Sequence, residues 1–270
     1  MDYIISGGLG FIGKNLVIKL RELKKEFQVL DRLNDFDVIK DPIFHAWCNT
    51  FVHLAAFTNV RESIEHPVKS IMENTEGTLS CLHYARESGA HFIFASSMGA
   101  AKSLSPYSAS KLAGEAFCVA YRASYTTPTT ILRLANVYGP HSKHKESVVA
   151  KFIKNCLDRE NIEIYGDGLQ TRDFVHVDDV VRTILHCSKA KLINVGSGKA
   201  TSILKLAEMI RSLSAELTGY IPEIVWEDAN NGEISTVDPK TNIHARVDLE
   251  TGLRSTFKWF MEHYHDKRVE

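Results

Sequence analysis

Three side chains that could transfer a proton lie close together in the stretch SSMGAAKSLSPYSASK. Tyr107 is followed four residues later by Lys111, and Ser97 lies ten residues before the tyrosine. If this stretch is helical from Ser105, residues i and i+4 share a face, so the lysine ammonium lies beside the phenol. A phenol of pKa ~10 needs a shift of roughly 3 units, or about 4 kcal/mol, to act as a base near neutral pH. A nearby cation favours the phenolate, so the spacing indicates a tyrosine that moves a proton on and off a hydroxyl group.

Ser97 ends an apolar run, HFIFASS, that reads as a strand. In a parallel sheet this position lies at the carboxyl edge, where doubly wound folds bind ligands, so its hydroxyl is placed to position a reacting oxygen. A simpler reading remains open, in which Ser96 and Ser97 cap the strand exit and Tyr107 and Lys111 are ordinary helix-surface residues.

Strand and helix patterns alternate along the first half of the chain and would position these residues. The expected strands are YIIS, QVLD, FVHLA, FIFAS and TTILRL, and the expected helices are 14–25, 72–88 and 107–125. Such alternation predicts an α/β fold, a doubly wound parallel sheet covered on both faces. Beyond residue 140 we expect helices at 148–157, 203–213 and 249–264, which indicate a smaller discontinuous lobe.

A glycine-rich turn connects the first strand to the first helix. Gly8, Gly10 and Gly13 follow the Gly-x-Gly-x-x-Gly pattern, which lets backbone approach a pyrophosphate at a helix N-terminus. Asp31 ends the next strand, where a carboxylate accepts hydrogen bonds from an adenosine ribose, so NAD is favoured. Arg32 follows it, and because a guanidinium can host a 2′-phosphate, NADP stays open. An oxidised nicotinamide would add a second positive charge near the tyrosine.

Composition argues against several other classes of protein. Lys and Arg total 32 and Asp and Glu total 33, for a net charge of -1, so we expect no nucleic-acid or membrane partner. The five cysteines are scattered without a Cys-x-x-Cys, and the 12 histidines include no His-Glu-x-x-His, so we predict reduced thiols and no metal site. No leader and no long apolar run are seen, so we expect a cytoplasmic protein.

Several motifs occur together in a characteristic order. They are SGGLGFIG, HLAA, NTEGT, FASS, YSASK, RLANVYGP, IYGDGLQTRDFVHVDD and NVGSG. With them the chain resembles the extended short-chain dehydrogenase/reductase family, in its NAD-dependent epimerase/dehydratase branch that acts on nucleotide sugars. The resemblance covers nearly the whole chain, and the run from Tyr165 to Asp179 is particularly specific.

The resemblance implies roles for matching positions. The implied catalytic set is Ser97, Tyr107 and Lys111. The implied cofactor-binding set contains Tyr107 and Lys111 again. Its other members are Gly7, Gly8, Gly10, Phe11, Ile12, Gly13, Asp31, Arg32, Asp37, Val38, Leu54, Ala55, Ala56 and Asn74. The implied substrate-binding set is Thr58, Ser97, Met98, Asn136, Val149, Tyr165, Arg172 and Arg246. Arg172 would grip a diphosphate, for which a guanidinium fork is suited.

The resemblance further implies an NAD-binding Rossmann domain at 1–140 and 174–198 and a nucleotide-sugar-binding lobe at 141–173 and 199–270. It also implies a homodimer that packs through the helices carrying Tyr107 and residues 72–88.

The chain departs from the family pattern in places that concern the substrate. The connections from Asp31 to FVHLAA and from Ser97 to Tyr107 are short, which indicates a more open cleft. Met98 and Gly99 follow Ser97, where 4,6-dehydratases carry Asp-Glu, so a dehydratase is disfavoured. Asn230 stands where a second phosphate-binding arginine is common, and Arg246 is a candidate substitute.

The sequence thus predicts an NAD-dependent nucleotide-sugar epimerase, acting at C4 through a transient 4-keto intermediate on a nucleotide-diphosphate sugar. An NAD(P)H-dependent reductase of nucleotide 4-keto-6-deoxy sugars is the alternative. A non-catalytic dinucleotide-sensing protein would keep the glycine turn, but it has no need of Ser97, Tyr107 and Lys111 together.

Overall fold

The computed structural model describes residues 1–41, 47–187, 191–228 and 239–266. It divides into two compact units. Unit 1 comprises Met1–Leu134 and Val181–Val195, and unit 2 comprises Ala135–Val180 and Gly196–Glu270. In the described part of the chain, no helix is long and apolar enough to cross a membrane.

Unit 1 is built on a parallel sheet of six strands. Its order is β2-β1-β3-β4-β5-β9, and every neighbouring pair is parallel. The strands are β1 (Tyr3–Ser6), β2 (Phe27–Leu30), β3 (Thr50–His53), β4 (His91–Ser97), β5 (Thr129–Leu134) and β9 (Leu192–Val195). Because a parallel sheet buries both faces, its strands are nearly continuous apolar runs, and the predicted doubly wound α/β fold is confirmed.

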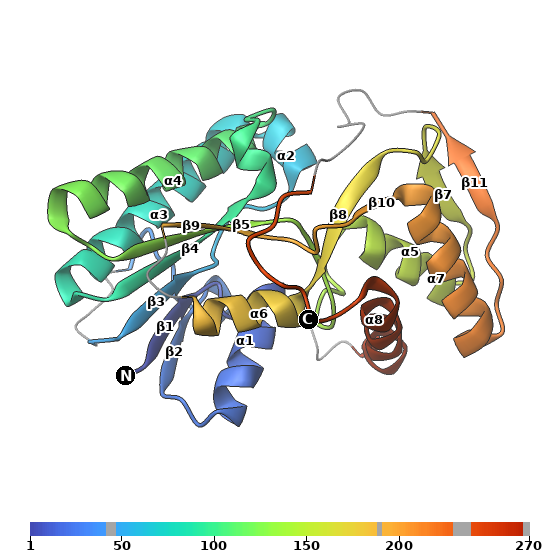
Figure 1. Cartoon of the computed structure of the whole chain (residues 1–270), viewed down its shortest axis with the longest axis horizontal. Helices are drawn as coiled ribbons and strands as arrows, with labels where there is room; N and C mark the ends of the chain where they lie inside the picture. The colour runs from blue at the N-terminus through green and yellow to red at the C-terminus, as the bar shows by residue number, and fades with distance from the viewer. Residues whose placement is uncertain (42–46, 188–190, 229–238, 267–270) are drawn as a thin grey trace. The chain divides into compact units, whose positions relative to one another are not determined.

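Helices cover both faces of this sheet, with α3 and α4 on one face and α1 on the other (Figure 1). The helices are α1 (Phe11–Glu22), α2 (Val60–Glu65), α3 (Pro67–Ser88) and α4 (Pro106–Tyr125), with short 3₁₀ turns η1 (Arg32–Asn34) and η2 (Met98–Ala101). Helix α6 (Val177–His186) contains the boundary between the two units. Beneath α3 and α4, the aromatic side chains of Phe51, Phe92 and Phe94 are completely buried.

The ends of two helices differ from the expected ranges. Helix α1 begins at Phe11 rather than at residue 14, because the glycine turn leads directly into its first turn with Gly10 as the N-cap. Helix α3 begins at Pro67 rather than at residue 72, since the fixed φ of a first-turn proline suits a helix start. The short helix α2 gave no signal that we recognised in the sequence.

Unit 2 surrounds its own hydrophobic core. A three-stranded sheet has the order β10-β8-β6, and a two-stranded parallel sheet pairs β11 with β7. These strands are β6 (Asn136–Tyr138), β7 (Ile162–Tyr165), β8 (Thr171–His176), β10 (Ala200–Ser202) and β11 (Ile224–Glu227). The helices are α5 (Val148–Leu157), α7 (Ile203–Thr218) and α8 (Leu249–His263). Phe152, Ile210, Phe257 and Phe260 are buried where these helices meet.

Candidate functional site

The glycine turn of unit 1 is too tightly packed for larger side chains. Gly7 has a φ of +72°, and a Cβ there would lie 2.5 Å from the Ala55 backbone nitrogen. A Cβ on Gly13 would lie 2.3 Å from the Gly7 carbonyl oxygen, so both positions require glycine. Gly10, the N-cap of α1, gives that helix no side-chain cap. The turn therefore fits a phosphate-bearing dinucleotide at a helix N-terminus, with Phe11 and Ile12 in the first turn.

Asp31 ties the end of β2 to the glycine turn. Its Oδ2 accepts a hydrogen bond from the Leu9 N–H at 2.9 Å, and its Oδ1 accepts one from the Leu33 N–H at 3.1 Å. The carboxylate is thereby held beside the turn, as a ribose-binding acid requires. Further along, Val38 is buried at 8% exposure, and the Asp37 carboxylate accepts from the Ile39 N–H at 3.0 Å.

Asn74 holds the loop that follows β3, the segment that carries Leu54, Ala55, Ala56 and Thr58. Its Oδ1 accepts from the Phe57 N–H at 2.7 Å, and its Nδ2 donates to the Phe57 carbonyl at 3.1 Å and to Ser110 Oγ at 2.8 Å. Ser110 Oγ in turn donates to the Tyr107 carbonyl at 2.7 Å. Asn74 thus connects the loop to the helix of the predicted catalytic tyrosine.

Tyr107 and Lys111 lie on α4, which begins with a strong local signal. Ser105 caps it by accepting from the Ser108 N–H, and Pro106 is the first helical residue. Lys111 is 4% exposed, and its Nζ donates to the Ala95 carbonyl at 2.9 Å, two residues before Ser97 in β4. The same Nζ lies 5.0 Å from the centre of the Phe94 ring and 6.0 Å from that of Tyr107.

Burial controls the electrostatics of this pair. It lowers the pKa of Lys111 to about 8 and raises the pKa of Tyr107 to about 12. The sequence interpretation expected Lys111 to lower the pKa of the tyrosine. In the chain alone, loss of solvation dominates, so a phenolate at neutral pH needs more positive charge than Lys111 supplies.

Ser97 ends β4 as predicted, and Met98 begins η2. Ser97 Oγ accepts from the Gly99 N–H at 3.1 Å, which is the capping contact considered as the simpler reading. A hydroxyl that accepts in this way still has its own proton to donate, so capping and positioning of a reacting oxygen are compatible.

A buried polar network lies directly beneath this site and was missed from the sequence. Ser96 Oγ donates to Glu115 Oε1 at 2.5 Å, and Arg133 grips the same carboxylate through Nε at 2.9 Å and Nη2 at 2.6 Å. Glu115 is 5% exposed and lies one helical turn after Lys111, on the same face of α4. The network fastens α4 to β4 and β5. The i+4 spacing was a signal that could have revealed it.

Replacing Glu115 with glutamine is expected to reduce the free energy of unfolding by about 2 kcal/mol, because it leaves the Arg133 charge without its partner. Urea unfolding of the variant provides the measurement. Glu76→Gln on α3, an exposed carboxylate, is the control and should change stability by less than about 0.5 kcal/mol. Equal stability of the two variants would show that the network does not hold α4.

His53, from the HLAA motif, has a structural role. It is 1% exposed, with Nδ1 2.6 Å from Ser6 Oγ and Nε2 3.2 Å from Thr78 Oγ1, and it stacks on Phe92 and Phe94. Burial, and to a lesser extent the Lys111 charge, lowers its pKa to about 3, so the ring is neutral at physiological pH.

The predicted substrate residues of unit 2 lie in different environments. Asn136 is exposed at the start of β6, and its Nδ2 donates to the Asp173 carbonyl at 3.3 Å. Tyr165 ends β7, with Lys151 Nζ 5.4 Å from its ring centre, and Arg172 in β8 donates from Nη1 to the Thr171 carbonyl at 2.9 Å. Val149 is 2% exposed within the core of the unit. Its side chain therefore serves packing rather than ligand contact.

Two buried aspartates of unit 2 hold backbone N–H groups in place. Asp173 accepts from the Ser197 N–H at 2.8 Å, from Ser197 Oγ at 2.6 Å and from the Gly198 N–H at 3.1 Å. Asp179 is 1% exposed and accepts from the backbone N–H groups of Arg246 and Val247. Asp179 thus fixes the backbone of Arg246, whose side chain is exposed. Asn230 lies outside the described residues.

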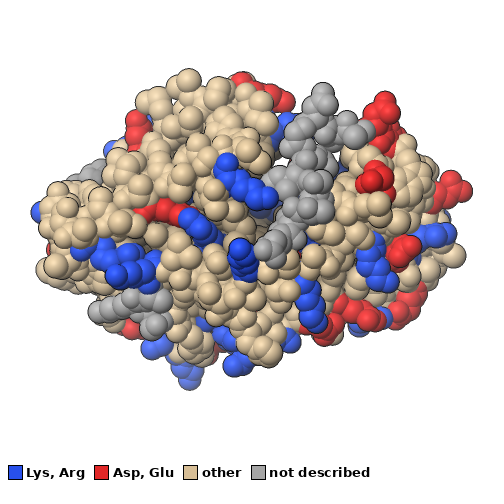
Figure 2. All heavy atoms as spheres, turned by 45° about the horizontal axis from the view of Figure 1, so that its top comes forward, with Lys and Arg blue, Asp and Glu red and all other residues tan. Residues whose placement is uncertain are grey.

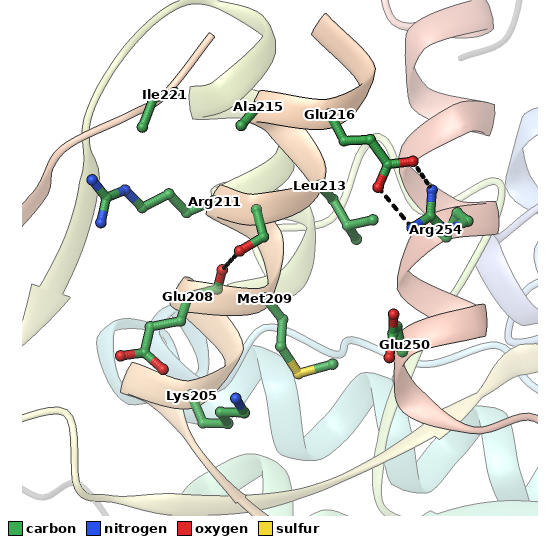
Figure 3. A pocket seen from close by; sticks show the side chains of 11 residues that line it. Lys205, Glu208, Met209, Arg211, Leu213, Ala215, Glu216, Ile221, Glu250 and Arg254 are labelled. Atoms are coloured by element: carbon green, nitrogen blue, oxygen red, sulfur yellow. Dashed lines mark hydrogen bonds and ion pairs between the residues drawn. The ribbon is translucent and has the colours of Figure 1, made fainter. Parts of the chain in front are cut away.

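A groove of about 710 Å³ on unit 2 contains none of the predicted site residues (Figure 3). It lies between α7 and α8, where Arg254 pairs with Glu216 across the groove, with Nη2 to Oε2 at 2.8 Å. Within the described ranges, no three His, Cys, Asp or Glu side chains are grouped as a metal site requires.

The six-stranded parallel sheet and the glycine turn define unit 1 as a Rossmann-type α/β fold. Residues 3–196 match the model of the NAD dependent epimerase/dehydratase family. The chain therefore belongs to this family, which confirms the resemblance identified from the motifs.

Individual relatives agree with this assignment. The UDP-glucuronate 4-epimerase of Thermodesulfobacterium geofontis is 30% identical over 90% of this chain and 83% of its own length. The crystal structure of Thermotoga maritima UDP-glucose 4-epimerase with UDP-glucose is 29% identical, with a TM-score of 0.88 over 97% of this chain and 99% of that one. The Thermus thermophilus UDP-glucose 4-epimerase in complex with NAD is 26% identical, with a TM-score of 0.86 over 97% and 100% of the two chains.

Proposed function

We propose that the chain is an NAD-dependent epimerase that inverts C4 of a nucleotide-diphosphate sugar through a transient 4-keto intermediate. The observation that carries the proposal is the placement of Tyr107 and Lys111, which lie on one face of α4 with the lysine bonded to Ala95 near the end of β4. Two relatives that the chain resembles along nearly its whole length are UDP-glucose 4-epimerases, one with UDP-glucose and one with NAD. Their ligands support a UDP-sugar and NAD as the ligands here.

In the proposed reaction, Tyr107 takes the proton of the sugar 4-hydroxyl, and Ser97 Oγ donates a hydrogen bond to the same oxygen. Bound NAD supplies the acceptor for the C4 hydride and an additional positive charge beside the phenol. Since burial alone raises the pKa of Tyr107 to about 12, that charge is what makes the phenolate accessible. Lys111 holds the nicotinamide ribose and contributes the second charge.

After the 4-keto sugar turns over, Tyr107 returns its proton to the oxygen as C4 regains its hydrogen on the opposite face. Because the hydride removed from C4 is returned to C4, no net cofactor would be consumed. Arg172 is proposed to hold the diphosphate during this rotation, with Asn136 beside it, since a guanidinium binds phosphate oxygens in a bidentate manner. The other residues that the resemblance implies as substrate contacts, and that we keep in this proposal, are Thr58, Met98, Tyr165 and Arg246.

The function is tested by incubating the protein with UDP-, dTDP- and GDP-sugars and resolving the products by chromatography. Reactions are run without added cofactor and then with NADH or NADPH. Interconversion of two 4-epimers without net cofactor change is the expected result. Turnover of only a 4-keto sugar, with stoichiometric loss of reduced cofactor, would contradict the epimerase and establish the reductase that uses the same residues.

We further propose that the protein is a homodimer formed through α3 and α4. These helices expose several large apolar side chains, and the surface over α4 in Figure 2 carries few charged groups. The exposed residues are Val68, Ile71, Met72 and Leu79 on α3 and Leu112 and Val119 on α4. An apolar face of this kind is typical of a subunit interface rather than of a solvated surface.

Replacing both Met72 and Leu112 with arginine is expected to convert the dimer to a monomer, because unpaired charges would be buried in the interface. Light scattering after size-exclusion chromatography measures the mass. As a control, arginine at the exposed Ile221 of unit 2 should leave the mass unchanged. A wild-type protein that is already monomeric at micromolar concentration would contradict the interface.

A further inference from the structure

The guanidinium of Arg32 is the feature that left the choice between NAD and NADP open, and the structure shows how it is bound. Its Nε donates to Asp37 Oδ2 at 3.2 Å, and its Nη1 donates to Glu73 Oε2 at 2.9 Å. Asp37 follows η1, whereas Glu73 comes from α3, 41 residues away in the chain. Two carboxylates therefore bind two different nitrogens of the Arg32 guanidinium, although the Arg32 side chain remains 56% exposed.

We infer that Glu73 is a specificity-determining residue, which, together with Asp37, prevents Arg32 from binding the 2′-phosphate of NADP. The inference rests on the proposed cofactor site. An arginine directly after the ribose-binding acid is normally the group that accommodates this phosphate. Here two carboxylates already pair with the guanidinium through Nε and Nη1, so they offset the charge that would attract a 2′-phosphate to its remaining N–H groups.

The local charge has the same effect. Asp31, Asp37 and Glu73 contribute three carboxylates, against the guanidinium of Arg32 and the ammonium of Lys40 near Asp37, and Asp31 is held beside the glycine turn by the Leu9 N–H. A phosphate monoester adds roughly 1.5 to 2 further negative charges near neutral pH. NAD brings only a 2′-hydroxyl to this position, which an acid accepts as a hydrogen-bond donor. The arrangement therefore selects against NADP more than it strengthens binding of NAD.

The contribution of Glu73 to cofactor specificity cannot be inferred from Asp31 and Arg32 alone, because Glu73 lies on α3. Its side chain is 24% exposed, and it immediately precedes Asn74, which is fixed by its bonds to Phe57 and Ser110. The backbone that presents Glu73 to Arg32 is thus anchored on its C-terminal side. An exposed ion pair contributes at most about 1 kcal/mol, so its removal should alter affinity by about fivefold rather than by orders of magnitude.

The test measures binding rather than turnover. Wild-type protein freed of bound dinucleotide is titrated with NADH and NADPH, and Kd is read from the nicotinamide fluorescence. Glu73→Ala is expected to bind NADPH about fivefold more tightly and NADH within about twofold of wild type. Glu76→Ala, which removes an exposed carboxylate one turn later on α3, should change neither affinity. Adding Arg32→Ala to Glu73→Ala should abolish the gain for NADPH.

Three other results would overturn the inference that Glu73 sets the cofactor specificity. Equal gains in Glu73→Ala and Glu76→Ala, or a gain that survives Arg32→Ala, would overturn the inference, because general charge rather than Arg32 would then be responsible. Tight NADH binding with no selective effect of Glu73→Ala would overturn it while leaving the proposed epimerase intact. If the wild type bound neither dinucleotide, the proposed cofactor site would fail as well.

Discussion

Tyr107→Phe is expected to lower kcat for the proposed sugar-nucleotide epimerisation by about 10³-fold, because it removes the group that we propose exchanges a proton with the 4-hydroxyl. The ring remains, so packing beside Lys111 and binding of the cofactor should be preserved. The loss should appear in kcat, with KM for the sugar nucleotide within a few-fold of wild type, since the proton moves only in the chemical step. Initial rates of epimer formation by chromatography give both parameters.

The matched control is Tyr121→Phe, the same substitution at another partly exposed position of α4. It should retain nearly full activity. Full turnover by Tyr107→Phe would exclude this tyrosine as the base, whereas equal losses in both variants would indicate a general effect on the helix. Either result would contradict the proposed mechanism.

Lys111→Met is expected to be less active by about 10²-fold and, at pH 7, more stable than the wild type. The buried ammonium has its pKa lowered to about 8 from the ordinary 10.5, so the folded chain at pH 7 carries a charge that costs about 3 kcal/mol relative to the unfolded chain. Loss of the hydrogen bond to the Ala95 carbonyl offsets part of the gain. We expect a net increase in the free energy of unfolding of about 2 kcal/mol in protein freed of dinucleotide.

The stability of the wild-type protein depends on pH because the pKa of Lys111 is lower in the folded chain than in the unfolded chain. Between pH 8 and 10.5, the unfolded wild-type lysine is still protonated while the folded one is losing its proton, so wild-type stability rises with pH. The gap between Lys111→Met and wild type should therefore narrow across this window and be largest below it. Urea unfolding at pH 7 and pH 9.5 measures the gap. Lys102→Met, at an exposed position, is the control and should show no such dependence.

The doubly wound sheet and the glycine-rich turn could be predicted from the sequence because their causes are local. Only glycine fits where a Cβ would meet backbone within 2.3 to 2.5 Å, as at Gly13 and Gly7, and continuous apolar runs are required in strands buried on both faces. Tyr107 and Lys111 are four residues apart, so helix geometry alone places them on the same face of α4.

Other features were decided by tertiary structure, because they join groups distant in the chain. The sequence leaves Arg32 open to a 2′-phosphate, and only folding brings Glu73 to its guanidinium. The bonds of Asp179 follow from folding for the same reason, since its backbone partners are 67 and 68 residues away. The pKa of Tyr107 depends on burial, which a spacing pattern does not contain. Residue types and local spacing determined which groups are present, while packing determined which charges meet and which lose water.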